Sequence, residues 1–161
     1  MEPPGQASQD TKLAPASNVT LKESSVKTYR IFISHSWAYK EQYKSLIRML
    51  TNADRFSFVD YSVPPDDPIH DADDDEMLRK EIRNQMSPCH VILILAGVYA
   101  TYSRWINEEI DLAESGFSGR KAIVAIEPWG AQRTSVRVKN AADRIVRWNT
   151  QSIVRAIREV G

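Results

Sequence analysis

The amino-acid sequence predicts an α/β fold, a flavodoxin-like three-layer sandwich of about five parallel strands with helices on both faces. Two observations predict it. Short β-rich apolar runs alternate with segments whose apolar residues recur at helical spacing. The most apolar run, residues 90–97, is continuous rather than alternating, which is typical of a central parallel strand covered on both faces. Short connections between such elements favour right-handed βαβ units.

The predicted strands are short runs rich in β-branched and aromatic residues. The run at 144–148 has the weakest pattern of the set. Strands are expected at residues 29–33, 56–59, 90–97, 121–126 and 144–148.

The predicted helices fill the segments between these strands. Leu78, Ile82 and Met86 follow one another at steps of four, which places them on one helical face. Asn149 and Thr150 are suitable caps for the last helix. Helices are expected around residues 43–50, 71–86, 105–115 and 149–160.

The length of 161 residues suits one domain with a tail. Residues 1–27 are rich in Pro, Ser, Gln, Thr and Lys and have few large apolar side chains, so we expect a disordered tail there. Residues 28–161 are expected to form the domain, because 42% of the chain is hydrophobic, enough for a core.

Charge and cysteine content exclude several classes of protein. The 21 basic and 21 acidic residues cancel, which gives no general attraction to nucleic acid or to an anionic membrane. We find no signal peptide and no apolar run of membrane-spanning length. The single Cys89 allows no intrachain disulfide and favours a cytoplasmic location, and His35, His70 and His90 are too scattered to predict a metal site.

Common nucleotide and hydrolase signatures are absent. The first strand is not followed by GxGxxG, and neither a GxxxxGK[ST] loop nor a GxSxG elbow is present. Ligands of open α/β sheets bind at the carboxyl ends of the strands. The segments that should hold a site are therefore 34–37, 60–71, 96–104 and 127–134.

Glu109 is the most unusual residue of the predicted 105–115 helix. At about 100° per residue, it falls in the same sector as the apolar Ile106 and Ile110, whereas Glu108 falls outside it. Burying an unpaired carboxylate is costly. Either an Arg or backbone N–H groups hold Glu109 structurally, or it lines a pocket and acts on a cationic substrate.

Other candidates follow the predicted strands. Asp60 is either a binding residue or a turn acid that caps the loop after its strand. His35 is either a pocket residue or a solvated loop histidine. Aromatic side chains near strand ends could stack on a nucleotide ring or belong to the core. These aromatic residues are Trp37, Tyr61, Tyr99, Tyr102 and Trp105.

These segments resemble the TIR-like family that includes the effector-generating proteins of bacterial Thoeris anti-phage systems. The Phe-Ile-Ser strand and the Ser-x-Trp-x-x-x-Glu helix, here Ser103, Trp105 and Glu109, are shared with TIR domains broadly. The resemblance covers about residues 29–158. It rests on residues 29–37, 56–64, 67–69, 88–97, 102–110, 121–130 and 148–150.

The resemblance implies cleavage of the nicotinamide–ribose bond of NAD⁺, with Glu109 as the catalytic acid. NAD⁺ would be the substrate, with no other cofactor, and a cyclic ADP-ribose product would reach a separate effector protein. Substrate contacts are expected from Ser34, His35, Trp37, Asp60, Tyr61, Tyr102 and Trp105.

Two other functions compete with this one. TIR domains also serve as non-catalytic modules that act by self-association, and fold alone does not decide between the two. A flavodoxin-like domain that binds a nucleotide or is of the receiver type is the third hypothesis. Against a receiver, the first strand ends in Ser34-His35-Ser36, without the paired acids that a phosphorylation site would want.

Overall fold

The protein is described by a computed structural model, which places residues 25–35, 39–63, 75–97, 103–128 and 134–161. Most of the predicted tail therefore lies outside the described residues. So do Trp37, Tyr99, Tyr102 and most of the loop predicted over residues 60–71.

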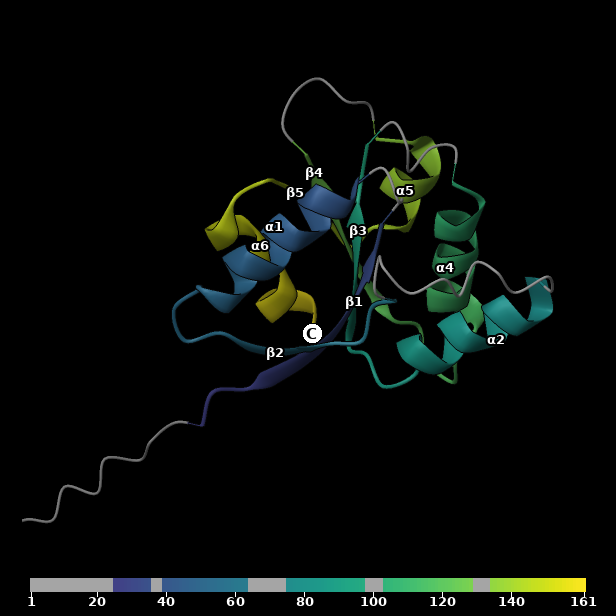
Figure 1. Cartoon of the computed structure of the whole chain (residues 1–161), viewed down its shortest axis with the longest axis horizontal. Coiled ribbons are helices and arrows are strands. Elements are labelled where there is room, and N and C mark those ends of the chain that lie inside the picture. Colours follow the sequence, from purple (N-terminus) through teal and green to yellow (C-terminus); the bar gives the residue numbers. More distant parts are fainter. Residues whose placement is uncertain (1–24, 36–38, 64–74, 98–102, 129–133) are drawn as a thin grey trace, which may run out of the picture.

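A single five-stranded sheet forms the centre of the domain (Figure 1). All its neighbouring strands pair in parallel, in the order β2-β1-β3-β4-β5. This is the flavodoxin-like order, so the predicted fold class is confirmed. The strands are β1 Thr28–Ser34, β2 Ser57–Asp60, β3 Val91–Leu95, β4 Ala122–Glu127 and β5 Arg144–Arg147.

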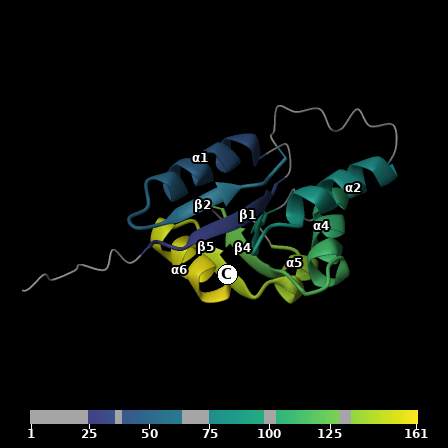
Figure 2. The same cartoon turned by 90° about the horizontal axis from the view of Figure 1, so that it is seen from below.

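Helices cover both faces of the sheet, as Figure 2 shows. Helices α1 and α6 lie on one face, and α2, α4 and α5 lie on the other. The helices are α1 Lys40–Thr51, α2 Asp75–Met86, α4 Arg104–Ser115, α5 Val136–Ala141 and α6 Thr150–Val160. No helix in the described ranges combines the length and apolar character that crossing a bilayer requires.

The continuous apolar run in the third strand is explained by two separate cores. Every residue of β3 is buried. Ile92 and Ile94 pack into the core beneath α2, α4 and α5, whereas Val91, Leu93 and Leu95 pack into the core beneath α1 and α6. A strand buried on both faces cannot alternate apolar and polar residues, which confirms its central position.

Helix α5 is the element that the sequence pattern did not predict. It has six residues, capped by Ser135, whose hydroxyl accepts a hydrogen bond from Val138 N at 3.2 Å. Only Val138 and Ala141 are buried in it, so its apolar face is too short to show a helical period. At the last helix, the predicted cap Asn149 is confirmed, because its side chain accepts from Ser152 N at 3.1 Å.

Candidate functional site

The candidate site lies where β1 and β3 end, at the point where the direction of winding reverses. The chain leaves β1 toward α1 on one face and leaves β3 toward α4 on the other (Figure 1). Ser34, the last residue of β1, is in register with Ile94 of β3. In sheets of this order the two helices diverge at this point and open a crevice, where ligands bind.

A buried hydrogen bond joins Ser34 to Glu109 across this crevice. Ser34 has no exposed surface and follows Phe32 on the face of β1 that α4 covers. Its hydroxyl donates to Oε2 of Glu109, and the contact is very short. Glu109 is 8% exposed, so the pair is almost completely withdrawn from water.

Glu109 is held inward by the way α4 begins and packs. Ser103 caps the helix by accepting from Ile106 N at 3.3 Å. Ile106 and Ile110 are buried in the core on the same helical face. The neighbouring Glu108 instead pairs with Arg79 of α2 at 3.1 Å and is partly exposed. The prediction that Glu109 faces inward and Glu108 does not is therefore confirmed.

The carboxyl group of Glu109 has no cationic partner among the described residues, where Ser34 is its one hydrogen-bond partner. Among the described residues, neither of the expected structural partners, an Arg or backbone N–H groups, is bonded to it. Burial raises the pKa of Glu109 to about 8, although the hydrogen bond from Ser34 acts in the opposite direction. Near pH 7 the group is therefore mostly protonated, and a positive charge brought next to it would favour ionisation.

His35 and Asp60 lie on the opposite side of the sheet from Glu109 and share the neighbour Tyr43, from α1. The His35 ring stacks on Tyr43, with the ring centroids 4.5 Å apart and the planes at 21°. Tyr43 Oη donates to Asp60 Oδ2 at 2.6 Å. Burial, followed by the hydrogen bond to Asp60, raises the pKa of Tyr43, so its hydroxyl stays protonated.

Asp60 also closes the turn after β2. Its Oδ1 accepts from the backbone N–H of Ser62 at 2.8 Å, the contact of an Asx turn. The Ser62 hydroxyl donates to the same oxygen in a very short contact. This is the turn-acid arrangement that the sequence offers as the alternative for Asp60.

Two predicted aromatic residues lie on the Glu109 side of the sheet. Tyr61 and Trp105 are both partly buried against the core that contains Ile106 and Ile110. The guanidinium of Arg104 lies 5.3 Å from the centre of the Trp105 ring. The structure therefore divides the predicted site between two groups, Ser34–Glu109 with these aromatics and His35–Asp60 with Tyr43.

Tyr43 and Ser62 are the residues that sequence reasoning missed. The spacing of Tyr43 with Leu46 and Leu50 predicts only one apolar face of a core helix. The signal for Ser62 was its position two residues after Asp60, the spacing of an Asx turn.

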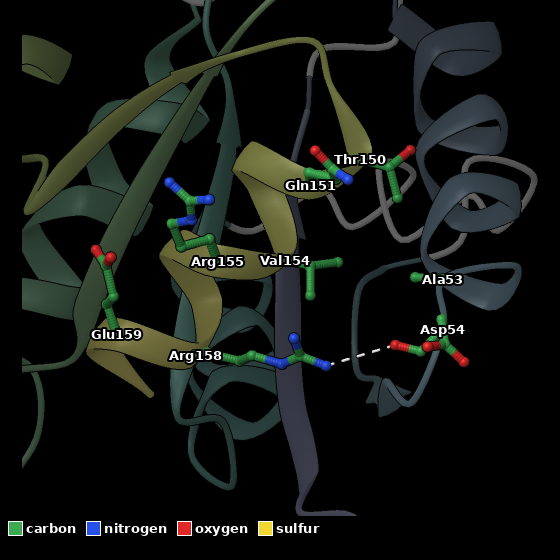
Figure 3. Close-up of a pocket in the computed structure, with 8 residues that line it drawn as sticks. All are labelled: Ala53, Asp54, Thr150, Gln151, Val154, Arg155, Arg158 and Glu159. Atoms are coloured by element: carbon green, nitrogen blue, oxygen red, sulfur yellow. Dashed lines mark hydrogen bonds between the residues drawn. The ribbon is translucent and has the colours of Figure 1, made fainter.

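Two cavities among the described residues lie elsewhere. One, of ≈ 500 Å³, separates α6 from the end of α1, with Val154 and Asp54 on its sides (Figure 3). The other, of ≈ 440 Å³, adjoins the start of β1 and shares Asp54 and Arg158 with it. Neither is lined by Ser34 or Glu109. Within the described ranges, no three His, Cys, Asp or Glu side chains gather as metal ligands would.

The family described as Thoeris protein ThsB, TIR-like domain, matches residues 32–133, which is more than half of the chain. The protein belongs to this TIR-like family. The match includes the end of β1 from Phe32, the Asp60 turn and all of α4, so Ser34 and Glu109 both lie inside the family region.

Comparison with solved structures gives two more distant likenesses. The Clostridium botulinum CMP N-glycosidase BcmB is 15% identical, covers 81% of this chain and 98% of its own, and superposes with a TM-score of 0.49. The SEFIR domain of the iL-17 receptor B is 10% identical, covers 81% of this chain and 97% of its own, with the same TM-score of 0.49. No curated protein sequence matches the chain.

Proposed function

We propose that this TIR-like domain cleaves the nicotinamide–ribose bond of NAD⁺ and releases nicotinamide with an ADP-ribose product. The observation that supports the proposal is the Glu109 carboxyl, which is buried at the switch point of the sheet, bonded to Ser34 and without a countercharge in the part of the chain that the structure describes. A structural carboxylate is normally paired when it is buried. Among the described residues, Glu109 accepts a hydrogen bond from one hydroxyl, that of Ser34. Such a carboxyl group is suited to binding a cationic ligand.

NAD⁺ carries the positive charge that a buried carboxyl would bind. Its nicotinamide ring is a cation, and an opposite charge within a few ångströms lowers the pKa of a carboxyl. Glu109 would lose its proton as the substrate binds. The carboxylate is then in place to stabilise the positive charge that develops on the ribose as the bond breaks.

The leaving group needs no proton. When the C–N bond breaks, both bonding electrons go to the ring nitrogen, so nicotinamide departs as a neutral molecule. One carboxylate can therefore carry the reaction, in contrast to the two acids of most glycoside hydrolases. Capture of the ribose cation by water gives ADP-ribose, and capture by the adenine or ribose of the same molecule gives a cyclic product. Either is a suitable signal for a separate effector protein.

The test is nicotinamide release from NAD⁺ by wild type, Glu109→Gln and Glu108→Gln. Gln keeps the size of Glu109 but cannot become an anion, so E109Q is expected to lose at least about a hundredfold in rate. E108Q is the matched control, because Glu108 is the next residue on α4 and pairs with Arg79. Equal rates for E109Q and wild type would refute the proposal.

The second candidate is a non-catalytic module that acts by self-association. Both edge strands carry an exposed aliphatic side chain, Val59 of β2 at 44% and Ile145 of β5 at 43%. Exposed strand edges are suited to pairing with another chain. This function predicts oligomers in sedimentation experiments that Val59→Lys or Ile145→Lys disrupts, and biological activity that survives E109Q.

A further inference from the structure

We propose that Tyr43 is a positioning residue, which holds the imidazole of His35 at the carboxyl end of β1 through a bracket completed by Asp60 and Ser62. The Tyr43 bracket is defined as Tyr43, Asp60 and Ser62. Its effect on turnover rests on the proposed function, whereas its effect on the His35 ring is independent of that function.

The bracket begins where the backbone ladder between β1 and β2 stops. Tyr61 N donates to Ile31 O at 2.9 Å, and this is the last backbone bond from that side. The next N–H along β1 that points the same way belongs to Ile33, and the hydroxyl of Ser62 accepts it at 2.7 Å. A side chain thus replaces the missing strand and fixes the final residues of β1.

Asp60 connects this end of the sheet to helix α1. Its Oδ1 accepts from both the N–H and the hydroxyl of Ser62, and its Oδ2 accepts from Tyr43 at 2.6 Å. Because both carboxylate oxygens are used, the Tyr43 hydroxyl has a fixed position relative to β1. The Tyr43 ring is fixed in turn, since its other side packs with the core beneath α1 and α6.

His35 is held at two points by these elements. Its ring stacks on Tyr43, and its Nδ1 lies 3.1 Å from Ile33 O. A carbonyl oxygen only accepts, so Nδ1 carries the proton in this contact, and in the neutral ring Nε2 is the acceptor. The contacts therefore set both the direction and the tautomer of the imidazole.

The position of His35 gives this arrangement a consequence for the site. His35 follows Ser34 directly, and Ser34 bonds Glu109. The bracket therefore fixes the strand end that supplies both side chains. A displacement of about 1 Å in a group that contacts substrate is enough to cost two orders of magnitude in rate.

The direct test is NMR of the histidine rings in wild type, Tyr43→Leu and the matched control Tyr29→Leu. Tyr29 lies at the other end of β1 and stacks on Phe56, with centroids 5.4 Å apart. The chain has three histidines, and the His35 signals are identified by their loss in His35→Gln. We expect ring-current-shifted His35 protons and an Nδ1-protonated tautomer in wild type and Y29L, and loss of both features in Y43L.

The kinetic test is a double-mutant cycle between Tyr43 and His35, measured as kcat/KM for nicotinamide release. Y43L alone is expected to lose about tenfold, with Y29L unchanged. In the H35Q background Y43L should cause no further loss, because its effect passes through His35. Independent, multiplicative losses would show a merely structural role for Tyr43.

The two arms separate the failure of this inference from that of the proposed function. His35 signals that are the same in Y43L and wild type would overturn the positioning role, whatever the activity. Absence of NAD⁺ cleavage by wild type would overturn the proposed function, and the spectra would still decide the role of Tyr43.

Discussion

Two carboxyl groups lie near the carboxyl ends of β1 and β2, and their surroundings differ sharply. Asp60 accepts three hydrogen bonds, from Tyr43 and from the N–H and hydroxyl of Ser62. Glu109 is more deeply buried and, among the residues that the structure describes, accepts one, from Ser34. Burial raises the pKa of Glu109 to about 8. The hydrogen bonds of Asp60 stabilise the fold. The ionised form of Glu109 is disfavoured by burial, and a cationic substrate next to it would favour that form.

The largest expected effect comes from the ionisation of Glu109. Its ordinary pKa of 4.5 applies in the unfolded chain, and burial raises it to about 8 in the folded one. The folded state therefore binds the proton more tightly, and its contribution to stability is present below pH 4.5 and lost as pH rises toward 8. The loss is on the order of 3–5 kcal/mol.

Glu109→Gln removes this titration and should flatten the pH dependence. The measurement is the free energy of unfolding by urea from pH 5 to 8, taken as the difference between the variant and wild type. E109Q should become the more stable protein toward pH 8. Parallel curves would mean that Glu109 does not titrate in this range.

Removing the hydroxyl of Ser34, which donates to Glu109, should have the next largest effect. In Ser34→Ala the hydrogen bond that lowers the pKa of Glu109 is lost, so this pKa should rise further. If the ionised form is active, the rise of nicotinamide release with pH should move to higher pH. Near pH 7 the rate should fall roughly tenfold or more, since a hydrogen bond to a charged group contributes about 1.5–3 kcal/mol.

The matched control for S34A is Ser57→Ala. Ser57 lies at the other end of the same strand pair, where its Oγ lies 3.1 Å from Thr28 Oγ1. S57A should keep the wild-type pH–rate profile. A shift of equal size in both variants would place the effect in the sheet rather than in the Ser34–Glu109 pair.

Removing the carboxylate of Asp60 is expected to lower the stability of the protein. Asp60→Ala removes the acceptor of three hydrogen bonds and leaves Tyr43 and Ser62 without their partner. A loss of at least about 1–3 kcal/mol is expected in urea unfolding, because a single buried donor left unpaired carries a penalty of that order and D60A leaves three donors without their acceptor. Asp60→Asn keeps one acceptor oxygen and should recover part of it. A D60A variant as stable as wild type would show that the hydrogen bonds of Asp60 do not stabilise the fold.

The smallest effect is expected at Glu108. Its ion pair with Arg79 joins α2 to α4, and the two side chains are 26% and 54% exposed. Partly solvated pairs of this kind contribute about 0–1 kcal/mol. Melting of Glu108→Gln should therefore stay close to wild type, and a loss above about 2 kcal/mol would show that this pair is important to the packing of α4.

The same two regions show what the sequence can and cannot predict. Glu109 was identifiable because helical geometry is local, and its neighbours Ile106 and Ile110 show which face turns inward. Its hydrogen-bond partner Ser34 could not be identified, because Ser34 is 75 residues away in the sequence and the contact depends on how α4 crosses the sheet. The strands were also predictable, except that β5 has mostly exposed side chains and shows only a weak pattern.

The contacts of the Tyr43 bracket could not be predicted from the sequence, for a physical reason. It depends on the register of β1 against β2, which leaves Ile33 N without a backbone partner, and no local period encodes that register. Tyr43 has the spacing of a core residue, and its hydroxyl is what distinguishes it. Helix α5 was missed because two buried residues are too few to show a period.

We propose that Glu109, and neither Asp60 nor Glu108, supplies the carboxylate that cleaves the nicotinamide–ribose bond of NAD⁺. The most direct measurement is mass spectrometry of NAD⁺ products from phage-infected cells that express wild type, E109Q or E108Q. We expect nicotinamide and an ADP-ribose product from wild type and E108Q, and neither from E109Q at equal protein levels. The same products from E109Q as from wild type would contradict it.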